Sequence, residues 1–324
     1  MIKVLIIGLG SIGQRHANAL ISLGIKDIAA LRTGKGQKDV LPMFDNIKVF
    51  TNEEDAFNWQ PTHIIISNPT SLHLHFVKIA IEKNIKFFVE KPISDDLKEI
   101  LAIEKLDKAK GVVGYNLRFH GLFRLIKEFI TNKTYGEVIS AQLHVGQYLP
   151  NWHPYEDYRD AYYSKKELGG GALRTLSHEI DLMQYFFGEV HSLFAKVQKD
   201  SNLEIDVDDV TNIIAKTDHC AQVNIHINVL DPNIVREGRI YFTDGVVRYD
   251  FMKSKVVFIS NTGEENIIYN QKESIDIQYQ DQMKEFISEN EPVLACTLKQ
   301  GIDVINIIEK CEESNEEKRE VCLV

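Results

Sequence analysis

Two side chains of this sequence, Lys91 and His178, have the chemistry needed to handle a proton on a substrate hydroxyl. Lys91 stands in Val89-Glu90-Lys91-Pro92, directly after an apolar run typical of a strand. A lysine ammonium at a strand end, beside a bound cofactor, would lie near a reacting hydroxyl and lower the pKa of that hydroxyl. The alternative is an ordinary surface lysine, because an isolated Lys-Pro pair is common on protein surfaces.

His178 follows a run of three glycines, Gly169–Gly171, and stands three residues before Asp181. Such glycines allow a close backbone approach before a helix starts. On one continuous helix, His178 and Asp181 would share a face with Arg174. A histidine titrating near neutral pH and oriented by a carboxylate suits proton exchange with a hydroxyl. The alternative is a core histidine, since the segment is also rich in leucine, isoleucine and methionine.

The pattern Gly8-x-Gly10-x-x-Gly13 follows the apolar run 3–7 and precedes a helical pattern. This order is the one that a dinucleotide-binding turn requires. Gly8 permits a tight turn, Gly10 lets the backbone approach a pyrophosphate, and Gly13 allows close packing of helix on strand. Ser11 and Ile12 begin the helix whose N–H groups would face the phosphates. The alternative is a glycine-rich turn with no ligand.

The end of the second predicted strand carries Leu31-Arg32-Thr33, with Lys35 and Lys38 beyond it. An NAD-preferring site normally places an acidic residue there to bind the ribose. Since that acid is missing and Arg32 can pair with a 2′-phosphate, the sequence slightly favours NADP over NAD. We expect Arg32 and Thr33 to bind the cofactor; a solvated basic loop is the alternative.

Polar segments also follow three other predicted strands, at the sheet edge where ligands bind in such folds. The first contains Asn68, Pro69 and His73, and the second is the Glu90-Lys91-Pro92 segment. The third runs from Gly114 to Phe119 and contains Asn116 and Arg118. Turn chemistry alone would also explain their proline, asparagine and serine content. We expect the cofactor to contact Asn68, Pro69, His73, Glu90, Lys91 and Arg118, and the substrate to contact Asn116.

The elements that must position these residues fall into two groups. Up to about residue 120, strands at 3–7, 27–31, 63–67, 87–89 and 112–115 alternate with helices such as 12–23 and 74–83. This order predicts an α/β Rossmann domain, a doubly wound parallel sheet, over residues 1–120. Later strands are expected at 138–147, 211–216, 221–229, 239–242 and 246–251, and residues 223–229 alternate apolar and polar side chains. They predict an α+β domain over 121–324, with a mostly antiparallel open sheet.

Bulk properties exclude several classes of protein. The formal charge of −10 over 324 residues argues against nucleic acid or an anionic membrane as a partner. The four cysteines show neither CxxC pairs nor metal-ligand spacing, so we expect reduced thiols and no metal. With no apolar stretch long enough to span a bilayer and no secretory signal, the sequence predicts a cytoplasmic protein.

Four motifs occur in the order seen in the Gfo/Idh/MocA oxidoreductase family, which this chain resembles. They are the glycine turn, Glu90-Lys91-Pro92, Gly114–Phe119, and the glycine run with His178 and Asp181. The resemblance implies an NAD(P)-dependent sugar or polyol oxidoreductase, with an open sheet that forms a homodimer or homotetramer interface. It also implies that Lys91 holds the substrate hydroxyl and His178 exchanges its proton, while hydride passes between the substrate carbon and nicotinamide.

One position departs from the family pattern. Many relatives have an aspartate three residues before the histidine, where this chain has Thr175. A threonine can hydrogen-bond a sugar hydroxyl but carries no charge. Either Glu179 or Asp181 supplies the carboxylate, or His178 works less strongly polarised.

The segment from Tyr148 to Arg159, with Trp152 between them, gives a clue to the substrate. Aromatic faces stack on sugars or bases, and Arg159 could hold a phosphate or carboxylate. We expect these three residues, with Arg174, Thr175 and His178, to bind substrate. The segment resembles family members acting on nucleotide sugars such as UDP-N-acetylglucosamine. Alternatives are a free-sugar or inositol dehydrogenase, or a catalytically silent cofactor-binding sensor or scaffold, which would need neither Lys91 nor His178.

Overall fold

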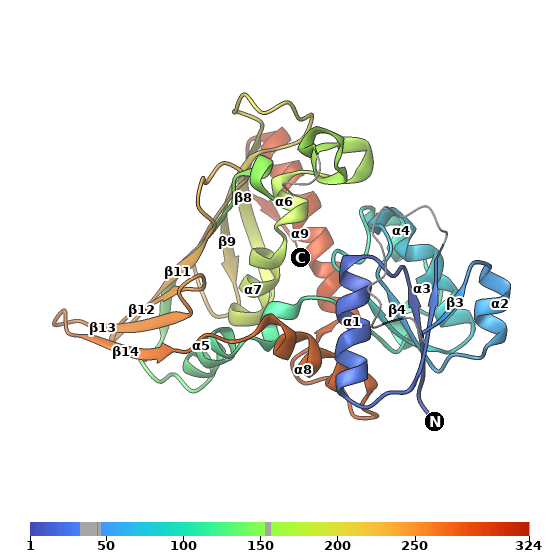
Figure 1. Cartoon of the computed structure of the whole chain (residues 1–324). Coiled ribbons are helices and arrows are strands. Elements are labelled where there is room, and N and C mark those ends of the chain that lie inside the picture. Colours follow the sequence, from blue (N-terminus) through green and yellow to red (C-terminus); the bar gives the residue numbers. More distant parts are fainter. Residues whose placement is uncertain (33–43, 45–46, 153–156, 324) are drawn as a thin grey trace. The chain divides into compact units, whose positions relative to one another are not determined.

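The computed structural model describes residues 1–32, 44, 47–152 and 157–323, which form two compact units (Figure 1). The first unit comprises Met1–Phe119 and Ser274–Ile305, and the second comprises His120–Glu273 and Asn306–Val324. The expected boundary near residue 120 is present. The assignment of all of 121–324 to the second domain needs correction, because Ser274–Ile305 returns to the first unit.

The first unit contains a seven-stranded sheet in the order β15-β6-β5-β4-β1-β2-β3. Around β1 the strands follow the Rossmann order 3-2-1-4-5-6 and run parallel, and only β15 is antiparallel to its neighbour. The predicted doubly wound sheet is therefore confirmed. The strands are β1 (Lys3–Ile7), β2 (Asp27–Leu31), β3 (Lys48–Phe50), β4 (His63–Ile66), β5 (Lys86–Val89), β6 (Gly111–Val113) and β15 (Cys296–Thr297).

Two helices that are far apart in the sequence cover one face of this sheet. They are α1 (Ser11–Ser22) and α8 (Ile275–Ile287), which pack against each other. Tyr279, Met283 and Phe286 of α8 enter the same buried cluster as β-strand residues such as Ile6 and Phe88. This apolar contact is the physical reason why Ser274–Ile305 belongs to the first unit.

The remaining helices of the first unit are shorter or lie elsewhere on the sheet. Helix α3 (His73–Glu82) packs against β4 and β5. Helix α4 (Leu97–Leu101) is capped by Asp96, whose Oδ1 accepts the Glu99 N–H at 3.0 Å. The other short elements are α2 (Glu53–Asn58), η2 (Thr70–Leu72), η3 (Leu106–Lys108) and η4 (Asn116–Phe119).

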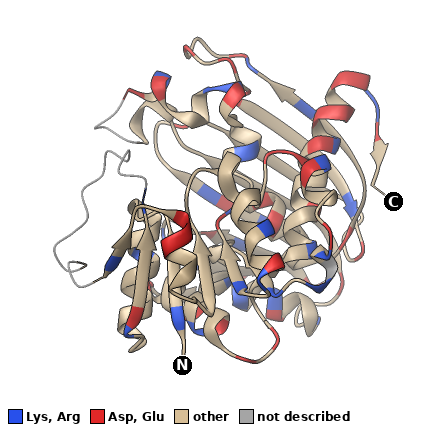
Figure 2. Ribbon diagram, turned by 90° about the vertical axis from the view of Figure 1, so that its right-hand side faces the viewer, with Lys and Arg blue, Asp and Glu red and all other residues tan. Residues whose placement is uncertain are grey.

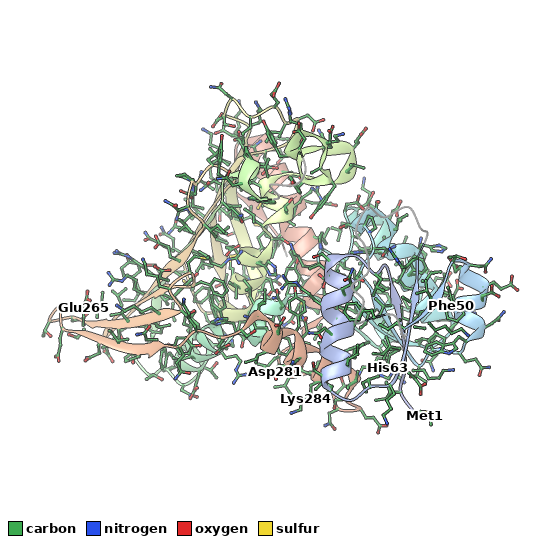
Figure 3. All side chains as sticks on the ribbon, viewed as in Figure 1. Met1, Phe50, His63, Glu265, Asp281 and Lys284 are labelled. Atoms are coloured by element: carbon green, nitrogen blue, oxygen red, sulfur yellow. The ribbon has the colours of Figure 1, made fainter. Side chains whose placement is uncertain are left out.

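The second unit contains a nine-stranded sheet in the order β14-β13-β12-β11-β7-β10-β9-β8-β16. Only β7 and β10 pair in parallel, which confirms the predicted mostly antiparallel sheet. The hairpin β13–β14, whose second strand begins at Glu265 (labelled in Figure 3), was not predicted. The strands are β7 (Val138–Gly146), β8 (Val190–Gln198), β9 (Val210–Thr217), β10 (Val223–Asn228), β11 (Val235–Phe242), β12 (Gly245–Asp250), β13 (Lys255–Ser260), β14 (Glu265–Asn270) and β16 (Val321–Cys322).

One face of this sheet packs against helices and the other is exposed. Helices α6 (Ala172–Thr175) and α7 (His178–Phe187) contact β10, and α5 (Gly121–Thr131) contacts α7. Along β9, Ile213 and Ala215 are buried whereas Ile214 between them is 50% exposed. The long helix α9 (Leu298–Glu317) begins in the first unit and ends in the second.

Charges of both signs are interspersed over the ribbon, with acidic residues along the last turns of α9 (Figure 2). Within the part of the chain that the structure describes, no helix is long and apolar enough to cross a membrane. Three of the four cysteines are buried: Cys220, Cys296 and Cys311.

Candidate cofactor and active site

The glycine turn joins β1 to α1 and is shaped by contacts that exclude larger side chains. Gly8 has φ +87° and donates its N–H to the Leu31 carbonyl oxygen at 3.0 Å. A Cβ at Gly13 would lie 2.1 Å from the Gly8 carbonyl oxygen. Close packing of α1 on the turn therefore requires glycine at residue 13, as predicted.

Gly10 differs, because no described atom lies within 4 Å of the place that its Cβ would take. It is the N-cap of α1, with an extended φ of −75° that any residue could adopt. The first turn, including Ser11 and Ile12, carries no acidic residue that would repel an anion. Open space before exposed helix N–H groups fits a pyrophosphate.

The segment after β4 lies against this turn. Ser67 Oγ donates to the Gly8 carbonyl oxygen at 2.8 Å, and a Cβ at Gly8 would lie 3.1 Å from the Asn68 backbone. The Oδ1 atom of Asn68 is buried and has no hydrogen-bond partner among the described residues. A buried acceptor in this state fits a ligand that donates a hydrogen bond. Pro69 caps the short helix η2.

His73 links the segment after β4 to the segment after β5. Its Nε2 is 2.9 Å from the Asn68 carbonyl oxygen, and its Nδ1 is 3.0 Å from the Pro92 carbonyl oxygen. Burial lowers the pKa of His73, so the neutral ring donates its single N–H to one of the two carbonyls. His73 is only 1% exposed, and it holds the segments after β4 and β5 together. Its direct contact with the cofactor stays a prediction.

Lys91 stands at the carboxyl end of β5, on the same sheet edge as the glycine turn. The Glu90 N–H donates to the Ile66 carbonyl oxygen at 2.9 Å, and Glu90 Oε2 accepts the Lys91 N–H at 3.2 Å. The Lys91–Pro92 peptide bond is cis. Lys91 is half-buried, and its predicted catalytic role stays a prediction.

Arg32 follows β2 directly, with its N–H donating to the Phe50 carbonyl oxygen at 2.9 Å. Its position at the carboxyl end of β2 is the one expected for ribose recognition. Thr33, Lys35 and Lys38 lie outside the described residues.

Asn116 and Arg118, on η4, lie in the interior of the first unit. Asn116 Nδ2 donates to Gln278 of α8 at 3.4 Å. Arg118, only 2% exposed, donates to Gln300 of α9 at 2.7 Å. The structure thus shows both residues bonded to the segment that returns to this unit, and their predicted ligand contacts stay predictions.

In the second unit, the three glycines pack against protein. A Cβ at Gly170 would lie 2.6 Å from the carbonyl oxygens of Tyr162 and Tyr163, and one at Gly171 would lie 2.0 Å from Asp208 Oδ1. Asp208 Oδ2 accepts the Leu173 N–H at 2.9 Å. Burial raises the pKa of Asp208 to about 6, against the opposing effect of these hydrogen bonds. Asp208 therefore fixes the backbone that leads to His178.

His178 is the first residue of α7, and the expected continuous helix is interrupted before it. Helix α6 ends at Thr175 and α7 begins at His178, so Arg174 does not share a helical face with His178 and Asp181. Arg174 instead binds Glu312 of α9 through both Nε and Nη2, at 2.9 to 3.2 Å. This ion pair ties α6 to α9, and the predicted contact of Arg174 with substrate stays untested. Thr175 is half-buried.

The two carboxylates considered as partners of His178 have different surroundings. Glu179 is fully buried and pairs with Arg236 of β11, with Oε1 2.7 Å from Nε. Asp181 is also fully buried and lies one helical turn after His178. Arg236 thus engages Glu179, and the orientation of His178 by Asp181 stays a prediction.

The aromatic segment before the glycine run is held by its own contacts. Tyr148 precedes η5 (Leu149–Asn151), and Trp152 donates its Nε1–H to the Gln147 carbonyl oxygen at 3.1 Å. The Trp152 ring lies 5.1 Å from that of Tyr163 on η7 (Tyr162–Ser164). Both predicted substrate residues are half-buried, so part of each ring stays available.

Arg159, on η6 (Tyr158–Asp160), is held by two carboxylates of its own unit. Its Nε is 2.8 Å from Asp157 Oδ1 and its Nη1 is 2.9 Å from Glu204 Oε2. Hydrogen bonds from Arg159 lower the pKa of Asp157 to about 2. These two carboxylates would compete with a bound anion for the guanidinium, and the predicted anion contact of Arg159 stays a prediction. The short helix η8 (Lys166–Leu168) leads from here to the glycines.

Sequence reasoning missed three residues that support the site: His16, Asp208 and Arg236. His16 binds Glu90, and Arg236 binds Glu179. The partners of His16 and Arg236 are 74 and 57 residues away in the chain, and that of Asp208, Leu173, is 35 residues away, so no local pattern links them. The one available signal was the position of His16, three residues after the last glycine of the turn.

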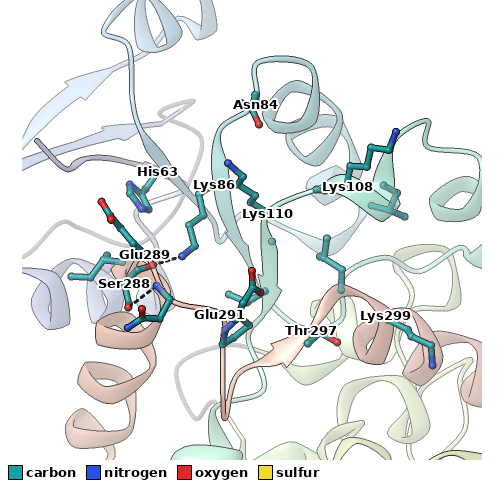
Figure 4. Close-up of a pocket in the computed structure, with 18 of the residues that line it drawn as sticks. His63, Asn84, Lys86, Lys108, Lys110, Ser288, Glu289, Glu291, Thr297 and Lys299 are labelled. Atoms are coloured by element: carbon teal, nitrogen blue, oxygen red, sulfur yellow. Dashed lines mark hydrogen bonds between the residues drawn. The ribbon is translucent and has the colours of Figure 1, made fainter.

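A groove of about 1250 Å³ lies at the opposite edge of the first sheet, where strands begin (Figure 4). Lys86 donates there to the Ser288 carbonyl oxygen at 2.6 Å, with Glu289 and Glu291 on the same loop. Burial and the Lys86 charge lower the pKa of His63 to about 4. Parallel sheets bind ligands at the carboxyl ends of their strands, so this groove is not the cofactor site.

Comparison with known proteins covers both units. Residues 2–117 match the family described as "Oxidoreductase family, NAD-binding Rossmann fold", and residues 123–248 match the "GFO/IDH/MocA C-terminal domain". Glucose-6-phosphate 3-dehydrogenase of Bacillus subtilis is 26% identical over 242 residues, covering 69% of this chain and 67% of that protein. With the first two curated relatives, the chain spans only 46% and 33% of their length.

Solved structures show the same fold at lower identity. The NADH complex of levoglucosan dehydrogenase superposes with a TM-score of 0.83 at 16% identity, covering 100% of this chain and 99% of that one. A myo-inositol dehydrogenase from Corynebacterium glutamicum gives 0.78 at 18% identity, covering 100% and 99%.

Replacing Gly10 by valine tests whether its open space receives a ligand. We expect G10V to fold with an unchanged melting temperature and to bind NADH or NADPH at least about tenfold more weakly, which corresponds to about 1.4 kcal/mol. G13V is the matched variant, because its Cβ meets backbone and should lower the melting temperature. Fluorescence titration gives the affinities; unchanged affinity in G10V would place the phosphates elsewhere.

Proposed function

Because the chain belongs to the Gfo/Idh/MocA oxidoreductase family, we propose that it transfers a hydride between a nicotinamide cofactor and a carbinol carbon of a sugar or polyol. One observation carries the proposal: Lys91 follows β5, which pairs with β4, and Ser67 after β4 contacts the glycine turn. A cofactor bound with its pyrophosphate at Gly10 and a substrate hydroxyl at Lys91 would share one sheet edge.

In this reaction Lys91, His178 and Asp181 would each have a separate role. The nicotinamide, when bound, accepts or donates the hydride. Lys91 donates a hydrogen bond to the substrate oxygen and stabilises its negative charge as the O–H proton leaves. His178 takes that proton during oxidation and returns it during reduction, and Asp181 orients its ring.

The substrate class follows from the second unit and from the relatives. Tyr148 and Trp152 offer half-buried aromatic faces, which stack on sugar rings. A nucleotide-linked sugar was expected from the segment between Tyr148 and Arg159, and the Arg159 guanidinium in it is already paired with Asp157 and Glu204. Relatives include a glucose-6-phosphate 3-dehydrogenase and a myo-inositol dehydrogenase. We therefore place a simple sugar or cyclic polyol ahead of a nucleotide sugar.

Turnover with a substrate panel tests this function. Reduction of NAD and NADP at 340 nm is followed with glucose 6-phosphate, myo-inositol, levoglucosan and UDP-N-acetylglucosamine. With the best substrate, K91M and H178N should each lower kcat by about 100-fold or more, with cofactor affinity nearly unchanged. K98M, on the exposed surface of α4, is the control and should match wild type.

Two results would contradict the proposal. Tight cofactor binding without turnover of any substrate would favour the catalytically silent sensor. Turnover only with the nucleotide sugar would restore the nucleotide-linked class.

We further propose a preference for NADP, because Arg32 occupies the position where an acidic residue would select NAD. R32A should weaken NADPH binding by about tenfold and leave NADH binding nearly unchanged, since only NADPH carries the 2′-phosphate. Wild-type protein that binds NADH more tightly than NADPH would overturn this assignment.

We also propose that the exposed face of the second sheet joins copies of this chain into a homodimer or homotetramer. Phe194 and Ile214 are directly paired on this face and are 42% and 50% exposed. Light scattering should give a multiple of 37.1 kDa, and the double variant F194D/I214D should give a smaller mass. A wild-type mass of one chain would contradict the interface.

A further inference from the structure

His16 is a polar residue in a place where packing alone would call for an apolar one. It lies on α1, one turn after the glycines, with its ring fully buried. The ring centroid is 4.8 Å from that of Phe88 and 5.3 Å from that of Tyr279, both edge-on. These two rings fix the orientation of the imidazole.

The imidazole is directed at Glu90. His16 Nε2 lies 2.7 Å from Glu90 Oε1. Since an ionised carboxylate only accepts, the Nε2–H of His16 donates. His16 Nδ1 is buried without a hydrogen-bond partner among the described residues, so the proton belongs on Nε2. The Glu90 side chain is only 16% exposed. Because the dielectric constant there is lower than in water, this hydrogen bond is stronger than one in water.

Glu90, which is held by His16, also binds the backbone of Lys91. Its second carboxylate oxygen, Oε2, accepts the Lys91 N–H at 3.2 Å. Gly114 leaves room for the carboxylate, because a Cβ there would lie 3.0 Å from the same oxygen. On the other side of Lys91, the Pro92 carbonyl oxygen is 3.0 Å from His73. The backbone around Lys91 is thus held from two helices, α1 and α3.

We propose that His16 is a positioning residue that acts through Glu90 to fix the place of Lys91 relative to the glycine turn. This inference rests on the proposed function, since it assigns the purpose of the contact to the reaction. His16 and the glycines belong to one helix. The same helix that would receive the cofactor phosphates therefore also sets the position of the lysine that would hold the substrate.

Two substitutions separate positioning from packing. The side-chain amide nitrogen of glutamine reaches about as far as Nε2 of histidine, whereas that of asparagine reaches only as far as Nδ1. H16Q should therefore keep the bond to Glu90 and retain kcat within about threefold. H16N should lose it and lower kcat by up to about 100-fold, with little change in NADPH or NADH affinity, because a small misplacement of a reacting group costs this much. H75N, at an exposed histidine of α3, is the control.

A second measurement needs no turnover. Trace acetylation followed by mass spectrometry gives the rate constant for Lys91 relative to exposed Lys98 in the folded protein. This ratio should change more than about threefold in H16N and stay within that range in H16Q and H75N, because only H16N releases the turn. If H16N changes this ratio while the wild-type protein turns over no substrate, the proposed function is wrong but the positioning contact is still supported.

Other outcomes overturn the inference. If H16N keeps both the wild-type kcat and the wild-type labelling ratio, His16 does not position Lys91. If H16Q and H16N lose activity equally and in proportion to a lowered melting temperature, the role of His16 is packing alone.

Discussion

The first unit depends on one close contact, that between Gly13 and the carbonyl oxygen of Gly8. With 2.1 Å between that oxygen and the place of a Cβ, only glycine lets α1 start so close to β1. The contact sets the path of α1 over the sheet. It thereby sets where the first turn of α1 begins and brings His16 to Glu90. The proposed cofactor turn and the proposed placement of Lys91 would thus have one steric origin.

The local parts of this arrangement could be predicted from sequence, because each is encoded within a few residues. The glycine spacing, the buried runs of β1 and β4, and Lys91 after β5 all lie within short windows. The return of α8 could not be predicted in this way. Tyr279 of α8 contacts His16, although the two residues are more than 250 positions apart in the chain. The polar and apolar pattern of α8 is also typical of any amphipathic helix and does not identify its partner.

The same limit applies to the partners of charged side chains. Arg159 was assigned to the substrate because its guanidinium could hold an anion, and Arg174 because it would share a helical face with His178. Their carboxylate partners, Glu204 and Glu312, are 45 and 138 residues further along the chain. An arginine fork binds whichever carboxylate the fold presents, so its role depends on tertiary structure. The glycines, in contrast, report backbone geometry, which is local.

The two units anchor their candidate reactive residues in a similar way. Glu90 accepts the N–H of Lys91, and Asp208 accepts the N–H of Leu173 on the helix before His178. The partners of these carboxylates differ. Glu90 also receives the His16 N–H, whereas Asp208 accepts the Leu173 N–H and the Thr211 hydroxyl, and burial raises its pKa to about 6. Burial thus outweighs the hydrogen bonds in setting the pKa of Asp208, while those same hydrogen bonds fix the backbone that leads to His178.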